Sequence, residues 1–183
     1  MKRSFSLLFT LLLLLLLITS CLTVEKKEYT FRMKDEKSGT LTIKFINLMS
    51  MKDDTADISE SDYGELQNTY LNGDQLESEY EFATVKSKRI FEENGVLCGE
   101  VIIDFEELSQ VGLYQYEEKG PYMINVGSFL EGESFLTSNG EYGGDIMPVV
   151  FWPKSTETLS LTTYVTSPDE STVGLLSLYN KNK

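Results

Sequence analysis

The segment from Ala83 to Phe105 constrains the fold of this 183-residue chain more than any other. Apolar and polar side chains alternate along much of both halves, and a Glu-Asn-Gly sequence at 93–95 separates the halves. Alternation with a period of two is typical of a strand with one buried face, and Asn-Gly is a strong turn signal. The segment therefore predicts a β-hairpin, and hairpins favour an antiparallel sheet.

Two turns fit this hairpin, and they place different side chains on each face. A two-residue Asn-Gly turn pairs Phe91 with Cys98. A three-residue turn shifts the pairing by one, so that Phe91 faces Leu97 and Val85 faces Ile103. The shift separates apolar from charged side chains more cleanly, and a one-residue slip exchanges the faces of a strand. We therefore predict the three-residue turn.

The three-residue turn also gathers a small apolar strip on the second face of the hairpin. Ile90, Cys98 and Ile102 form this strip, inside a border of charged side chains. A helix or a second sheet layer that covers the strip is the ordinary interpretation. An uncovered strip is instead a candidate face for a ligand or a protein partner. The reactivity of Cys98 toward a thiol probe distinguishes the two.

Similar alternation recurs along the chain and predicts a sheet of seven or more strands. Short turns rich in polar residues or glycine separate most of them, as in antiparallel sheets. The predicted strands outside the central hairpin cover residues 28–33, 40–48, 113–117, 122–126, 134–138, 146–152 and 158–166.

Helices are predicted in two regions. Residues 60–71 carry an apolar stripe with helical spacing, and Ser59 is suited to cap them, with a short second helix at 74–80. Residues 167–170 (Ser-Pro-Asp-Glu) have the composition of a helix start, so we expect a C-terminal helix from there to about Asn180. The predicted class is α+β: a curved antiparallel sheet built from hairpins, with two or three helices packed on it.

The first 21 residues have a different character. Two basic residues are followed by an apolar run over 5–18, and Ile-Thr-Ser-Cys closes the segment at Cys21. The run is shorter than the roughly 20 residues of a spanning helix, and its end fits the ordinary secretory cleavage pattern poorly. The segment resembles a bacterial lipoprotein signal peptide, and Ile-Thr-Ser-Cys resembles a lipobox.

This resemblance implies a location. A diacylglycerol would be attached to the thiol of Cys21, and residues 1–20 would be removed as a signal peptide. Residues 21–27 would then form a lipidated tether, and 28–183 a single α+β envelope domain. Leu22, rather than aspartate, follows the cysteine, which by analogy with enteric sorting implies the outer membrane. We therefore expect a lipid-anchored protein of the bacterial cell envelope.

A second resemblance concerns the predicted hairpins. The segments Tyr29–Phe45 and Val85–Phe105 are similar to hairpins of LppM-like envelope lipoproteins. That family implies a compact envelope domain that binds lipid, and no catalytic residue carries over from it.

Composition limits the chemistry. Acidic residues outnumber basic residues by 29 to 16, which argues against nucleic acid as a partner and against electrostatic adsorption to anionic lipid. The chain has no histidine, so histidine-based triads, Cys-His dyads and His-ligated zinc are excluded. If Cys21 is acylated, Cys98 has no partner for an intrachain disulfide. We predict no catalytic residue, no metal and no cofactor.

Residues 52–62 are rich in carboxylates. Counted from Asp53, the sixth residue is not glycine and the twelfth is not glutamate, so the spacing does not match a calcium-binding loop. A solvated loop is the favoured interpretation, and an irregular calcium site is the alternative. Asp54-Thr55-Ala56 also resembles the acceptor sequence for O-glycosylation in Bacteroidetes, which implies Thr55 as a modification site.

Three functions follow from these observations. The first is a non-catalytic interaction module for an envelope protein. The second is a protein that binds an apolar ligand, such as a lipid acyl chain, on the concave side of the sheet. The third, an enzyme without histidine, lacks any recognisable motif. A large apolar cavity would favour the second function, and a flat exposed apolar patch would favour the first.

Overall fold

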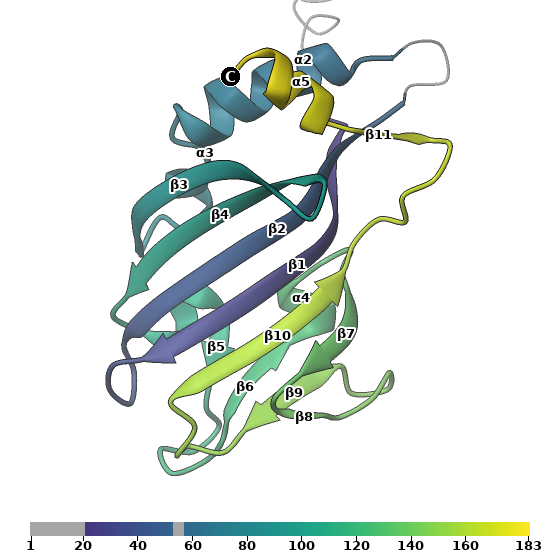
Figure 1. Ribbon diagram of the computed structural model, residues 1–183. Helices are drawn as coiled ribbons and strands as arrows, with labels where there is room; N and C mark the ends of the chain where they lie inside the picture. The colour runs from purple at the N-terminus through teal and green to yellow at the C-terminus, as the bar shows by residue number, and fades with distance from the viewer. Residues whose placement is uncertain (1–20, 53–56) are drawn as a thin grey trace, which may run out of the picture.

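The computed structural model describes residues 21–52 and 57–183, which form an α+β fold (Figure 1). Within these residues, eleven strands form two sheets in which every pairing is antiparallel. Short helices pack on the larger sheet, which confirms the predicted fold class. The predicted leader, residues 1–20, and Thr55 lie outside the described residues.

The larger sheet has the order β3-β4-β2-β1-β10-β7, and a short strand, β11, pairs with the end of β2. Alternation explains its buried face, because Tyr29, Phe31, Leu41 and Ile43 lie at alternate positions and are all buried. Its strands are β1 (Leu22–Met33), β2 (Gly39–Met51), β3 (Thr84–Glu93), β4 (Val96–Phe105), β7 (Ser134–Ser138), β10 (Thr158–Tyr164) and β11 (Thr172–Gly174).

Strand β1 begins at Leu22, six residues before the predicted start. Val24 is buried, and the hydroxyl groups of Thr23 and Thr166 lie 2.5 Å apart. The predicted tether at 21–27 is therefore wrong as a description of the backbone, since most of it forms the first half of a central strand. Residues 25–27 lie in this strand despite their charged side chains, because β1 pairs with both β2 and β10.

The smaller sheet packs behind the part of the larger sheet that lies away from the helices (Figure 1). The core between the sheets includes Phe31, Ile103, Ile124 and Trp152, all fully buried. The indole nitrogen of Trp152 donates a hydrogen bond to Asn139 at 2.7 Å. The strands of this sheet are β5 (Leu113–Tyr114), β6 (Tyr122–Asn125), β8 (Glu141–Tyr142) and β9 (Val149–Trp152).

Four helical segments gather at one end of the larger sheet (Figure 1). All but one of them, α3, pack on a second apolar cluster that includes Val24, Leu48, Leu66, Leu97 and Leu175. These segments are α2 (Ser59–Glu65), the π-helical η1 (Leu66–Leu71), α3 (Gln75–Glu79) and α5 (Leu176–Lys181). The 3₁₀ segment η2 (Leu108–Val111) and α4 (Val126–Phe129) lie elsewhere in the chain.

The helix predicted at 60–71 is confirmed as α2 and η1, although Ser59 is its first residue and not its cap. The C-terminal helix is shorter than predicted, because α5 begins only at Leu176. Residues 167–170 are not helical: the carboxylate of Asp169 accepts hydrogen bonds from Ser171, and β11 then pairs with β2. The predicted helix start at Ser167 is therefore wrong, because the residues that follow it form β11 and pair with β2.

The turn of the central hairpin also differs from the prediction. Asn94 and Gly95 both have positive φ, 52° and 78°, which is the two-residue turn that Asn-Gly favours. Phe91 therefore pairs with Cys98 rather than with Leu97. A register shift between Val85 and Ser87 then restores the predicted pairing of Val85 with Ile103.

Candidate functional site

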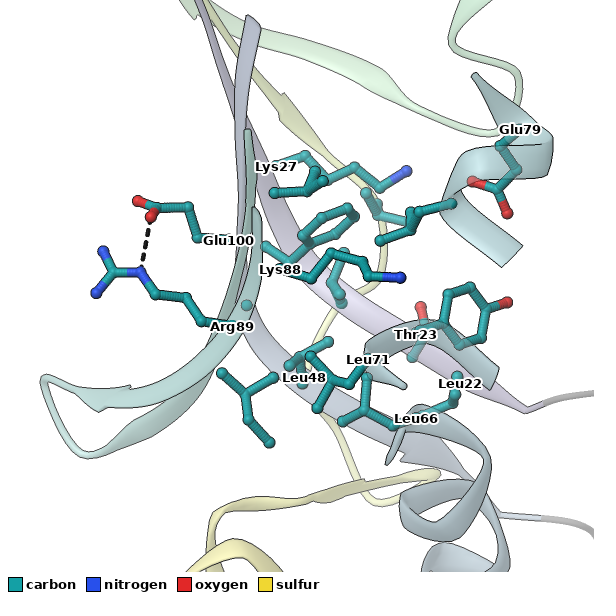
Figure 2. Close-up of a pocket in the computed structure, with 18 residues that line it drawn as sticks. Leu22, Thr23, Lys27, Leu48, Leu66, Leu71, Glu79, Lys88, Arg89 and Glu100 are labelled. Atoms are coloured by element: carbon teal, nitrogen blue, oxygen red, sulfur yellow. Dashed lines mark hydrogen bonds and ion pairs between the residues drawn. The ribbon is translucent and has the colours of Figure 1, made fainter. Parts of the chain in front are cut away.

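A cavity of about 280 Å³ lies between the larger sheet and the helices, and Figure 2 shows the side chains around it. Strands β1, β2, β3 and β4 form one wall, and η1 and α3 form the other. The volume lies just below the range of about 300–1,000 Å³ that is typical of small-molecule sites. Its walls are mainly apolar and include Val24, Phe45, Leu48, Leu66, Leu71 and Ile90.

A glycine in the middle of β4 makes room for this cavity. A Cβ atom at Gly99 would lie 3.5 Å from side-chain atoms of both Leu48 and Phe45, which is ordinary contact. A larger side chain at this position would extend into the hollow that Gly99 lines. Glycine inside a strand weakens the strand and often marks a place where another group approaches closely. Sequence reasoning missed Gly99, which hints at such a close approach but does not by itself predict the cavity.

The charged groups around the cavity are bound to other protein groups. The ammonium of Lys88 donates to the carbonyl oxygen of Gly73 at 2.6 Å and to Glu77 at 2.9 Å. Arg89 and Glu100 point to the other side of the sheet and pair with each other at 2.7 Å (Figure 2). The interior is therefore apolar, with its cationic groups held by partners at the edge.

A second cavity of about 570 Å³ shares Lys27 and Glu79 with the first. Lys27 forms part of the division between them, because its ammonium lies 2.6 Å from Glu133 and 5.8 Å from the centre of the Phe45 ring. The second cavity is more polar, and Phe82 and Phe129 are exposed beside it.

Glu133 anchors the division between the cavities. Its carboxylate accepts hydrogen bonds from the hydroxyl of Tyr29 at 2.9 and 3.0 Å and from the hydroxyl of Thr163. Burial, followed by the nearby charge of Glu133, raises the pKa of Tyr29. Burial likewise raises the pKa of Tyr80, with Glu79 and Glu133 adding to the effect. Both phenols therefore stay neutral hydrogen-bonding groups around neutral pH.

The predicted strip of Ile90, Cys98 and Ile102 does not exist as one surface. The two-residue turn pairs Ile90 with Gly99 and places it on the cavity side, whereas Cys98 lies on the opposite face. Ile102, two residues from Cys98, shares that opposite face. Cys98 is only 1% exposed, and burial is the main cause that raises the pKa of its thiol. The prediction of a common contact face is wrong, but Ile90 alone does line a cavity.

Cys21, the predicted lipidation residue, lies immediately before β1 and is half-buried. Its carbonyl oxygen accepts a hydrogen bond from the backbone nitrogen of Met51 at 2.8 Å. The first three residues of β1, Leu22 to Val24, line the first cavity. The predicted attachment point and the candidate binding site are therefore neighbours in the fold.

The described ranges, 21–52 and 57–183, hold no group of three or more cysteine, aspartate or glutamate side chains placed to bind a metal ion. No helix in the same ranges is long and apolar enough to cross a membrane. In comparisons with known proteins, no family model, no curated protein and no solved structure matches this chain.

Proposed function

We propose that this chain is a lipid-anchored protein of the bacterial cell envelope that binds a linear apolar ligand, such as a lipid acyl chain, without catalysis. The observation that carries the proposal is the first cavity, which has mainly apolar walls and edge cations that already have partners. An apolar hollow supports a ligand-binding function better than a flat contact surface for a protein.

The affinity should come mainly from the removal of apolar ligand surface from water. Each buried methylene group contributes about 0.8 kcal/mol, so binding should strengthen with chain length until the cavity is full. Lys88 and Lys27 are engaged by Glu77 and Glu133, so a charged head group is not required for binding. An uncharged alkyl chain and a fatty acid of the same length should therefore bind with similar affinity.

Gly99 provides the sharpest test of this site. Gly99→Leu should fill the cavity and abolish the binding of a fluorescent fatty acid, while the protein stays folded. Gly99→Ala is the matched control, because its Cβ makes only ordinary contacts and leaves most of the hollow open. Fluorescence titration and thermal unfolding of both variants measure the two effects. Equal binding by Gly99→Leu and the unaltered protein would show that the ligand binds elsewhere.

The anchor requires a separate experiment. Mass spectrometry of protein purified from membranes should find the N-terminus at Cys21 with a diacylglyceryl group, and any co-purified apolar ligand. Cys21→Ala should lose the lipid and leave the membrane fraction or remain as uncut precursor, whereas Cys98→Ala should keep both lipid and location. An unmodified Cys21 in membrane-derived protein contradicts the lipoprotein proposal.

A further inference from the structure

The proposed attachment point, Cys21, is next in sequence to the first residue that lines the cavity. Cys21 is followed directly by Leu22, Thr23 and Val24, and all three line the first cavity. An extended chain covers at most about 3.3–3.6 Å per residue. A lipid on the thiol of Cys21 is therefore attached to the protein within a few ångströms of the cavity wall.

The backbone at this point is fixed on both sides. Leu22 pairs with Ser50 of β2, and the nitrogen of Met51 donates to the carbonyl oxygen of Cys21. On the other side, the nitrogen of Thr166 donates to the carbonyl oxygen of Val24 at 3.1 Å. The start of β1 is part of the sheet, so it cannot act as a flexible spacer between a lipid and the domain.

We infer that the lipid on Cys21 holds the domain directly against the bilayer, with the end that carries α2, α5 and the first cavity toward the membrane (Figure 1). This inference rests on the proposed anchor at Cys21. The turn between β1 and β2 then points away from the membrane, because the twelve residues of β1 span roughly 35–40 Å. The cavity lies within reach of the lipid chains of that leaflet, so its ligand is a membrane-resident chain.

Charge does not explain this orientation. Two lysines at the membrane-facing end already have acceptors: Lys181 lies 3.6 Å from Glu60, and Lys52 donates to the carbonyl oxygen of Glu170. Asp57 and Asp169 add negative charge nearby. An interface held by electrostatics would weaken as salt screens it. An orientation fixed by covalent attachment should instead be the same at low and high salt.

Two variants, each with one introduced cysteine for a dye, can measure the orientation. Glu170→Cys lies beside β11 at the membrane-facing end, and Lys37→Cys lies in the exposed turn at the far end of β1. Cys98 is buried and the thiol of Cys21 is blocked by its lipid, so a dye should label only the introduced residue. The lipidated protein is purified from membranes and reconstituted into phosphatidylcholine vesicles that contain an acceptor dye on the lipid head groups.

We expect energy transfer to the bilayer to be several-fold stronger from Glu170→Cys than from Lys37→Cys, at low and high salt alike. A Gly-Ser linker inserted between Cys21 and Leu22 should remove most of this difference while the protein stays on the vesicles. The same linker inserted at Gly143-Gly144, in a loop of the smaller sheet, is the control and should leave the difference intact.

Three results would overturn the inference, and they are distinguishable. Equal transfer from both labels on protein that stays with the vesicles would show that the anchored domain has no fixed orientation, and the anchor itself would stand. Labelling of Cys21 by the dye, with loss of the protein from the vesicles, would overturn the anchor and this inference together. A difference that disappears at high salt would assign the orientation to surface charge instead of to attachment.

Discussion

The ammonium of Lys27 lies 2.6 Å from a carboxylate oxygen of Glu133, whose side chain is only 4% exposed. This contact joins β1 to the segment before β7, at the division between the two cavities. Lys27→Met retains most of the side-chain length but leaves the carboxylate without its cation. We expect it to lower the free energy of unfolding by about 2 kcal/mol.

Glu133→Gln should lower the free energy of unfolding less in the Lys27→Met background than alone, because the double variant has neither charge. Urea denaturation of the two single variants and the double variant gives the coupling between the residues. If the two single losses simply add in the double variant, the pair does not interact as the structure indicates.

Cys98 should be unreactive in the native protein, since its side chain is 1% exposed and burial raises the pKa of its thiol. In a Cys21→Ala background, a thiol probe should label Cys98 only as fast as the protein unfolds. The labelling rate with increasing urea measures this. Rapid labelling without denaturant would mean that the outer face of β4 is open, contrary to the structure.

Gly39 begins β2 where the chain has no room for a side chain. A Cβ atom there would lie 2.3 Å from the carbonyl oxygen of Arg32 and 2.9 Å from the ring of Phe105. We expect Gly39→Ala to destabilise the protein by about 2–3 kcal/mol, through strain in the sheet. Gly64→Ala in α2 is the control: its Cβ would meet nothing within 4 Å, and alanine favours a helix. A similar loss of stability in both variants would contradict this steric argument.

Stability at alkaline pH should depend on Tyr29 and Tyr80. Burial raises both phenol pKa values above the ordinary value of 10.0, so the folded state favours the neutral form. The contribution of the two neutral phenols to the free energy of unfolding is fully present below about pH 10. It declines as the pH rises further, because the phenols of the unfolded chain ionise first. Phenolate absorbance should show these two residues ionising only as the protein unfolds, and their replacement by phenylalanine should reduce the loss of stability above pH 10. Ionisation of both in the folded protein near pH 10 would contradict the prediction.

Much of the sheet was predictable, because alternation along one buried face is a local property of the sequence. The strands at 84–93, 96–105 and 158–164 were recovered within one or two residues at most of their ends. The first half of β1 was missed, because Glu25, Lys26 and Lys27 do not look like a strand until β10 pairs with it. The helix prediction from Ser167 was wrong for a similar reason. The residues that follow form β11, which pairs with the end of β2, a segment far away in the sequence.

The central hairpin shows why a clean pattern can mislead. Alternation favoured a register with Val85 and Ile90 on opposite faces of β3, with Val85 toward the core. The structure places both on the inner side, because an extra residue, Lys86, lies between the two registers. Such a bulge leaves no reliable local signal. The candidate strip was wrong because it depended on that register. The cavity was not predictable from the strands, because η1 and α3 form one of its walls.

The position of β1 also limits when this fold can be completed. It pairs with β2, which follows it at once, and with β10, which lies near the end of the chain. During synthesis, one edge of β1 therefore stays without its partner until residues 158–164 have emerged. Contacts so distant in sequence slow the final folding step, and an open strand edge invites wrong pairing meanwhile. A chain with this topology can therefore complete its larger sheet only after nearly its whole length is available.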